Sequence, residues 1–133
     1  MRIISHDQQP TEEWRAGVLT RMRVSALTDA VQLCIFEQWC EPGTGARTHL
    51  HHVEEVLTIV AGQAEFWVGE ERQRVSAGQS VLVPAGLKHG FSNVGDSILH
   101  LQAVLAAPYF EMSLEKGSEP TRRWAKSIGE QRE

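Results

Sequence analysis

The sequence lacks the features that identify several large classes of protein. None of its apolar runs approaches the roughly 18–20 residues that a helix needs to span a bilayer. Its 13 basic residues are outnumbered by 17 acidic ones, and the formal net charge of −4 argues against nucleic acid or an acidic membrane surface as the main partner. The first ten residues contain no apolar run of the kind found in signal peptides, so we expect a cytoplasmic protein.

The sequence has only two cysteines, and their spacing argues against a disulfide bond. Cys34 and Cys40 lie six residues apart in a segment with strand character, which separates them by about 20 Å along an extended strand. A disulfide cannot bridge that distance. We therefore expect two buried free thiols, and a redox or metal-binding role is the alternative.

The composition predicts one domain that covers residues 1–133. Hydrophobic residues make up 41% of the chain and charged residues 23%, which is typical of a soluble domain with a core. The apolar segments are short and separated by turn residues, and nothing between residues 31 and 105 has helical periodicity, which predicts an all-β sandwich or barrel. The predicted strands are residues 2–5, 17–26, 31–40, 47–53, 55–60, 64–68, 72–76, 80–83, 89–93 and 98–105.

The two ends of the chain are expected to lie outside the core of the barrel, which we place at about residues 17–106. Residues 1–16 would contribute an N-terminal strand. Residues 111–133 are rich in charge of both signs and form either a polar tail or a short helix. Trp124 and Ile128 are four residues apart and would share one face of that helix, packed on the barrel or on a partner subunit.

The spacing of the histidines is the feature that points to a function. His49 and His51 are two residues apart, so on a strand their side chains point to the same side and can converge on one ion. Glu55 follows with the same parity, and His89 begins a later predicted strand after a turn. Three imidazoles and one carboxylate suit a divalent transition metal, namely manganese, iron, nickel, zinc, copper or cobalt. Spacing alone leaves open that these are ordinary surface or core histidines.

Ten residues in two segments occur at a spacing that identifies a family. They are Gly43, His49, His51, Glu55 and Gly62 in the first segment, and Gly78, Pro84, Gly86, His89 and Asn93 in the second. This arrangement resembles the paired motifs of the cupin superfamily. The gap of 15 residues between the segments is similar to that of its small, single-domain (type 2) bacterial members.

The resemblance implies a single jelly-roll β-barrel, also called a double-stranded β-helix, that holds one divalent transition metal per chain. His49, His51, Glu55 and His89 would be the ligands, and Glu55 would act as a general base when released from the metal. Asn93 would stabilise a loop through its amide. The resemblance also implies a homodimer. The motif glycines would form turns that require positive φ angles; they are Gly43, Gly62, Gly78 and Gly86.

Further side chains are candidates for a substrate pocket around this site. Arg47 would hold a carboxylate or phosphate at the mouth of the barrel, and His100 would contact substrate. Aromatic side chains would form the wall, which favours a small, partly apolar or aromatic ligand over a highly charged one. Each of these residues also has a simpler interpretation as core, interface or solvated surface. The candidates are Arg47, Phe36, Trp39, Trp67, Phe91 and His100.

Two kinds of function fit these features. The first is a small metalloenzyme that acts on a small organic substrate as a dioxygenase, decarboxylase, isomerase or cyclase. The second is a non-catalytic module that binds or senses a small molecule. The sequence shows no helix-turn-helix pattern, which argues against a complete transcription regulator. Neither the metal nor the substrate follows from the sequence.

Overall fold

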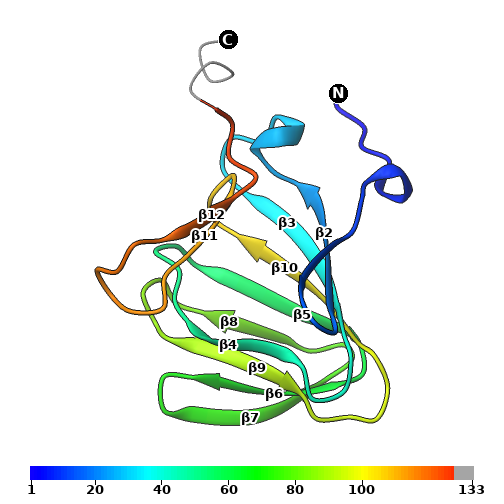
Figure 1. Cartoon of the computed structure of the whole chain (residues 1–133), viewed down its shortest axis with the longest axis vertical. Helices are drawn as coiled ribbons and strands as arrows, with labels where there is room; N and C mark the ends of the chain where they lie inside the picture. Colours follow the sequence, from blue (N-terminus) through cyan, green and yellow to red (C-terminus); the bar gives the residue numbers. More distant parts are fainter. Residues whose placement is uncertain (128–133) are drawn as a thin grey trace.

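The regular secondary structure of the chain is almost entirely β-strand (Figure 1), which confirms the predicted all-β class. A computed structural model describes residues 1–127, so Ile128 of the expected C-terminal helix lies outside the described residues. No helix within residues 1–127 is long and apolar enough to cross a membrane. The elements are η1 (His6–Gln8), β1 (Glu12–Arg15), β2 (Val18–Val24), η2 (Ala26–Thr28), β3 (Cys34–Cys40), β4 (Gly45–His49), β5 (Glu55–Ala61), β6 (Gln63–Val68), β7 (Glu71–Ser76), β8 (Ser80–Val83), β9 (His89–Asn93), β10 (Leu99–Leu105), β11 (Phe110–Met112) and β12 (Thr121–Arg123), where η marks a 3-10 turn.

Two antiparallel sheets form a jelly roll (Figure 1). One sheet has six strands in the order β1-β2-β3-β10-β5-β8, and the other has four in the order β4-β9-β6-β7. Strands that are distant in sequence are neighbours, as β3 and β10 are in the first sheet. In the second sheet β4 lies beside β9, so the two motif segments come together at this pairing.

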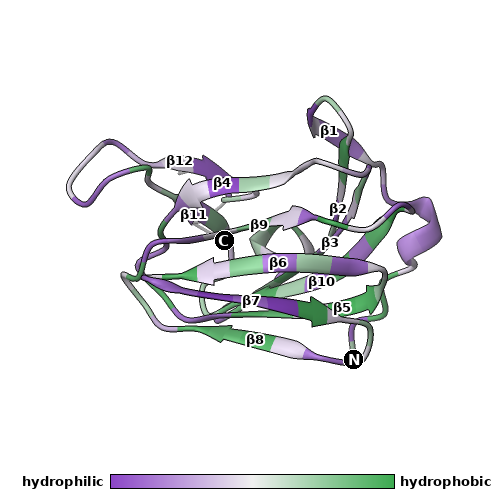
Figure 2. Ribbon diagram, turned by 90° about the horizontal axis from the view of Figure 1, so that it is seen from below, coloured by the Kyte–Doolittle hydropathy of each residue, from purple (hydrophilic) through white to green (hydrophobic). Residues whose placement is uncertain are grey.

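Every second side chain along the strands points between the sheets, and these side chains form the core. Leu99, Leu101, Ala103 and Leu105 of β10 are fully buried, whereas the residues that alternate with them are partly exposed. Phe66 and Phe91 of the smaller sheet stack with ring centroids 5.2 Å apart. In Figure 2 hydrophobic and hydrophilic residues alternate along β6, and the edge strand β7 is hydrophilic over most of its length.

Both cysteines are buried free thiols, as expected. Cys34 is the first residue of β3 and Cys40 the last. Burial raises the pKa of the Cys34 thiol to about 12 and that of Cys40 to about 11. Both side chains therefore behave as small apolar core residues at neutral pH.

The turns between the strands confirm the expected roles of the motif residues. The four motif glycines, Gly43, Gly62, Gly78 and Gly86, have φ angles of +83°, +93°, +87° and +80°. The amide of Asn93 donates hydrogen bonds to the carbonyls of Cys40 and Ser97, at 2.9 and 2.8 Å. Its oxygen accepts one from the N–H of Gly95 at 2.9 Å. Asn93 thus closes the loop between β9 and β10.

The N-terminal strand expected within residues 1–16 is present, but it does not lie at residues 2–5. Residues 2–5 form no strand, and Ile3 is 80% exposed, so these residues have no apolar face to bury. The strand is instead β1, which pairs with β2 at the edge of the six-stranded sheet.

The C-terminal segment is neither a plain tail nor a helix within the described residues. β11 and β12 pair as an antiparallel hairpin. Trp124 follows β12 with a φ of +66°, which is incompatible with a right-handed helix. Its ring is 9% exposed and packs against Trp14, Phe36 and Phe110. Burial of this indole within the aromatic cluster explains why the segment folds back onto the jelly roll.

Candidate metal centre

Four side chains from the two motif segments converge at one point between the sheets. Each of His49, His51, Glu55 and His89 offers one ligand atom, and these atoms all lie within 4.8 Å of one another. The imidazole centroids are 4.4 to 5.2 Å apart. The Nε2 atoms of His89 and His51 lie 3.0 and 3.3 Å from Glu55 Oε1. The structure therefore brings together the set that the sequence singled out.

A β-bulge in β4 turns His49 toward this point. Ala46 pairs with Phe91 and His49 pairs with His89, so three steps along β4 match two along β9. Without the extra residue, Ala46 and His49 would face opposite sides of the sheet. Because of the bulge, both residues face the same cavity.

Two glycines let β4 and β9 approach each other closely. A Cβ atom at Gly45 would clash with the carbonyl oxygen of Phe91. A Cβ atom at Gly90 would lie 2.6 Å from the carbonyl oxygen of Ala46 and 2.5 Å from the Trp67 ring. Sequence reasoning missed both residues. The available signal was a glycine inside a predicted strand at position 90, which often marks a close backbone approach.

Backbone contacts hold His51 and Glu55 beside β4. Leu50 and Ser113 exchange two backbone hydrogen bonds, of 2.8 and 3.0 Å. The carbonyl of His51 accepts a hydrogen bond of 2.7 Å from the N–H of Gly86, so the turn of the second motif holds a histidine of the first. Glu55 begins β5, which lies between β10 and β8, and its residue is only 3% exposed.

Each of the three histidines has its Nδ1 atom fixed by a backbone carbonyl. A carbonyl oxygen only accepts, so each Nδ1 carries the hydrogen and each Nε2 is left to face the common point. A carbonyl partner for the second ring nitrogen is usual for histidines that bind metal. The acceptors for His49, His51 and His89 are the carbonyls of Arg47, Glu111 and Leu87, at 2.7, 2.7 and 2.9 Å.

The arrangement around the Glu55 carboxylate requires a positive charge. If the rings were neutral, the Nε2 lone pairs of His51 and His89 would point at a carboxylate oxygen. His51 Nε2 is buried and, despite the 3.3 Å separation, makes no hydrogen bond within the described part of the chain. Either a ring proton or a metal ion must therefore lie between these atoms. Three imidazoles and a carboxylate fit a divalent first-row transition metal.

Burial and mutual charge shift the pKa values of these groups. Burial, assisted by His89 and His51, lowers the pKa of His49 to about 4. Burial opposes the ionised form of Glu55, but its contacts with His51 and His89 outweigh burial and lower its pKa to about 2. For His51, burial lowers the pKa, but Glu55 and the Glu111 carbonyl raise it overall. At neutral pH Glu55 is ionised and His49 is neutral, as metal ligands must be.

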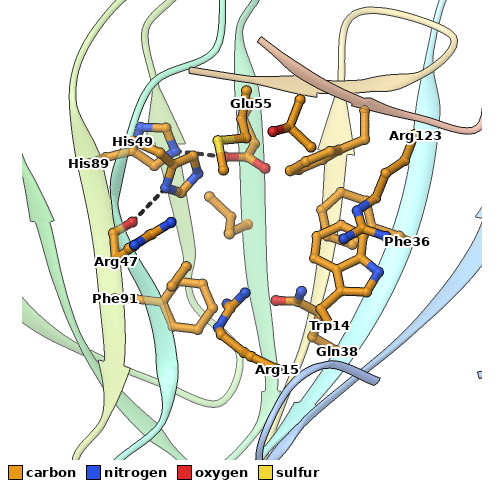
Figure 3. A pocket seen from close by; sticks show the side chains of 15 residues that line it. Trp14, Arg15, Phe36, Gln38, Arg47, His49, Glu55, His89, Phe91 and Arg123 are labelled. Atoms are coloured by element: carbon orange, nitrogen blue, oxygen red, sulfur yellow. Dashed lines mark hydrogen bonds and ion pairs between the residues drawn. The ribbon is translucent and has the colours of Figure 1, made fainter. Parts of the chain in front are cut away.

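A cavity of about 500 Å³ lies beside the four-residue cluster (Figure 3). His49, Glu55 and His89 form part of its wall, and Figure 3 shows Trp14 and Phe36 across the cavity from the two histidines. The remaining lining residues are Arg15, Gln38, Ala46, Arg47, Leu57, Phe91, Phe110, Met112, Thr121 and Arg123. The wall is thus aromatic and apolar, with three arginines.

The candidate pocket residues divide between the two faces of the sheets. Phe36, Phe91 and Arg47 line the cavity. The backbone carbonyl of Arg47 also orients His49, so this residue contributes to both the pocket and the cluster.

The other candidates, Trp39, Trp67 and His100, lie outside the cavity lining. Trp39 and His100 are register partners in β3 and β10, and their rings stack with centroids 4.9 Å apart. His100 Nε2 donates a hydrogen bond of 3.0 Å to Glu37 on that same face. Strand alternation explains the difference, because Phe36 points into the cavity and a residue three positions later on the same strand points out.

Sequence reasoning missed several cavity residues that come from the chain ends. Trp14 and Arg15 belong to β1, and Arg123 belongs to β12. Nothing in the local pattern indicates that these segments meet. Gln38 was also missed, although its parity with Phe36 on β3 was an available signal.

The two antiparallel sheets place the chain among the jelly-roll proteins, and the cluster of three histidines and one carboxylate is a group that could hold a metal ion. A family model described as "Cupin domain" matches residues 37–105, which is more than half of the chain. This chain belongs to the cupin family.

Individual cupins and one curated relative show how far the similarity extends. An RmlC-like cupin from Shewanella frigidimarina shares the fold with a TM-score of 0.68 at 21% identity, covering 81% of this chain and 95% of that one. An oxalate decarboxylase from Lactobacillus farciminis, solved as a formate complex, has a TM-score of 0.74 at 21% identity over 83% of this chain and 35% of that one. Polyketide synthase CurC of Streptomyces cyaneus is 29% identical over 96 residues, 68% of this chain and 60% of CurC. The chain thus spans less than two thirds of CurC.

Proposed function

We propose that this protein is a metal-dependent enzyme that acts on a small organic molecule. Its single divalent transition metal is bound by His49, His51, Glu55 and His89. The observation that carries the proposal is the convergence of these ligand atoms within 4.8 Å of one another, at the wall of a cavity of about 500 Å³. Four protein ligands leave one or two positions open on a five- or six-coordinate ion, and the cavity gives a substrate access to them.

The residues of this chain have distinct tasks in such a site. When bound, a divalent metal supplies a Lewis acid that polarises a substrate oxygen, and a redox-active metal adds electron transfer. The carbonyls of Arg47, Glu111 and Leu87 keep the three imidazoles in one tautomer. The aromatic wall around Trp14 and Phe36 offers an apolar surface to the body of a bound molecule.

Glu55 is the residue that we propose as a general base as well as a ligand. Its carboxylate faces the cavity, which places it within reach of a bound molecule. Held by His51 and His89, with a pKa of about 2, it is a weak proton acceptor. Proton transfer from substrate to Glu55 therefore requires that these two contacts loosen during the reaction.

The relatives and the cavity wall together indicate which reaction classes to expect. Similarity to polyketide synthase CurC and an aromatic cavity wall favour a planar substrate and cyclase-type or isomerase-type chemistry. The fold shared with oxalate decarboxylase supports decarboxylation as the second candidate. Dioxygenase chemistry is a further candidate, and it requires a redox-active metal.

Turnover by the reconstituted protein tests this proposal. The wild-type chain is loaded with each divalent metal in turn and incubated with diketones, flavonols, oxalate and sugar phosphates, and substrate loss is followed by mass spectrometry. We expect turnover that disappears in His89→Ala and persists in His52→Ala, because His52 is an exposed neighbour outside the cluster. Binding of a compound without turnover would instead support a non-catalytic, sensing module.

A homodimer is also part of the proposal. Val60 and Leu82, on neighbouring strands of the six-stranded sheet, are 52% and 59% exposed. A second copy packed on this outer face would cover both apolar side chains. Light scattering should give about twice the 14.9 kDa chain mass, and a monomer at working concentration would contradict this part of the proposal.

A further inference from the structure

The cavity carries a positive charge that the metal cluster does not explain. Arg15 of β1, Arg47 of β4 and Arg123 of β12 all line it, and Figure 3 shows their side chains around the cavity. Among the lining residues Glu55 is the one acidic side chain, and it is already engaged with two histidines. The cavity therefore presents three guanidinium groups to any molecule that enters it.

Two of these arginines have no acidic partner in the part of the chain that the structure describes. Arg47 is exposed and forms no ion pair within residues 1–127. Arg15 donates from Nε to the carbonyl oxygen of Gly45 at 2.7 Å and from Nη2 to the same atom, so its position is fixed by a neutral group. Burial lowers the pKa of Arg15, and the charges of Arg47 and Arg123 lower it further. Arg47 and Arg123 thus both repel the charge of Arg15.

The third arginine belongs to a wall in which both ends of the chain take part. The Arg123 guanidinium lies 4.2 Å from the centroid of the Trp14 ring and 3.6 Å from Glu12 Oε1. Glu12 also accepts a hydrogen bond of 3.0 Å from Trp124 Nε1. These residues lie outside the segment 37–105 that matches the family. The chain ends therefore add side chains to the cavity that the family match does not include.

Aromatic rings complete the lining on the same side. The ring of Trp14 lies 5.7 Å from that of Phe36 and 4.8 Å from that of Phe110, and the latter two rings are 5.7 Å apart. A volume of about 500 Å³ suits a small organic molecule. Flat apolar rings next to unpaired guanidinium groups suit a ligand with a planar body and a negative charge.

We propose that the ligand of this cavity is a planar organic carboxylate. Its carboxylate binds to Arg47 together with Arg15 and Arg123, and its apolar body lies against Trp14 and Phe36. A guanidinium group matches a carboxylate through two parallel hydrogen bonds, and the anion also offsets the repulsion of Arg15 by Arg47 and Arg123. The inference rests on the proposed function in that the same molecule would reach the metal through this cavity.

Calorimetric titration of the full chain with 2-naphthoate and with its neutral analogue 2-naphthamide tests the inference. We expect 2-naphthoate to bind at least about tenfold more tightly than the amide, as expected for a charge-assisted contact. Arg47→Gln should lower the affinity for 2-naphthoate by about tenfold without changing the affinity for 2-naphthamide. Arg47→Lys should restore part of the lost affinity. Arg123→Gln provides a second variant with the same expectation.

Arg72→Gln is the matched control, because Arg72 of β7 pairs with Glu65 away from the cavity. It removes the same charge and should leave both affinities unchanged. Equal binding of acid and amide, no binding of the acid, an Arg47→Gln variant with wild-type affinity, or tighter binding of 2-naphthyl phosphate would each overturn the inference.

The titrations are run on metal-free and metal-loaded protein so that the two proposals can fail separately. Uptake of metal without preference for the carboxylate contradicts the ligand inference and leaves the proposed metal site intact. Preference for the carboxylate in a chain that takes up no metal contradicts the proposed function and leaves the ligand inference intact.

Discussion

His49 and His89 are register partners in β4 and β9, and their imidazole centroids lie 4.4 Å apart. The bulge in β4 aligns the two residues, and Gly45 and Gly90 let their strands approach. Two imidazoles at this separation cannot both be charged without strong repulsion, and burial together with His89 keeps the pKa of His49 near 4. The pair therefore presents a neutral His49 Nε2 to the site at neutral pH.

Replacing His49 by alanine should abolish tight metal binding. The variant loses a ligand, so we expect the affinity to fall by more than the ~10–100-fold that changes outside the ligand set cost. Competition with a chromogenic chelator measures this affinity. His52→Ala is the control because His52 is exposed and stands outside the cluster. Wild-type affinity in His49→Ala would show that His49 is not a ligand.

Gly45→Ala should destabilise the protein and weaken metal binding together. The added Cβ meets the carbonyl of Phe91, so β4 must move away from β9, at a cost of about 1–3 kcal/mol. Gly78→Ala is the comparison, since its Cβ meets nothing within 4 Å and only its positive φ is strained. Urea unfolding of the metal-free protein measures stability. We expect both variants to lose stability and only Gly45→Ala to lose metal affinity; unchanged affinity in Gly45→Ala contradicts the role of the close approach.

Asn93→Ala should lower stability without changing the metal stoichiometry of the folded protein. The variant leaves the carbonyls of Cys40 and Ser97 and the N–H of Gly95 without their side-chain partner, which costs about 1–3 kcal/mol in a buried position. Urea unfolding and elemental analysis of the same samples measure the two effects. An Asn93→Ala variant that keeps the wild-type free energy of unfolding but loses its metal would contradict this prediction.

The two thiols should react slowly in the folded protein and faster as the pH rises. Thiolate is the reactive form, and burial raises the pKa of Cys34 to about 12 and of Cys40 to about 11. At pH 8 both groups are therefore almost fully protonated, and we expect labelling at least ~100-fold slower than in urea. A chromogenic disulfide reagent gives both rates. Rapid labelling of either cysteine in the native state would contradict its burial.

The central strands and the converging residues could be predicted because they depend on local patterns. Short apolar runs between turn residues indicated β2, β3 and β5 to β10, and a fixed spacing indicated which histidines converge. The strand predicted at residues 47–53 was partly wrong, because β4 is Gly45–His49 and His51 lies beyond its end. Parity alone could have separated Phe36 from Trp39, since residues three apart on a strand face opposite sides. Trp39 in fact stacks on His100 on the outer face of its sheet.

The chain ends could not be predicted because their structure depends on contacts between distant residues. The sequence left Trp124 either in a polar tail or on a short helix, whereas its burial against Trp14 and its hydrogen bond to Glu12 hold it at a bend directly after β12. The same docking brings Arg15 and Arg123 to one cavity. No periodicity within either segment reveals that they meet.

Metal stoichiometry of the wild-type chain tests the central claim most directly. The purified protein is stripped with a chelator, reconstituted separately with manganese, iron, cobalt, nickel, copper and zinc, desalted and measured by elemental analysis. We predict one ion per chain for at least one of these metals, and its loss in His51→Ala, because His51 Nε2 is buried and aimed at the site. A folded wild-type chain that retains none of these metals, or a His51→Ala chain that retains the same amount as wild type, would contradict the account.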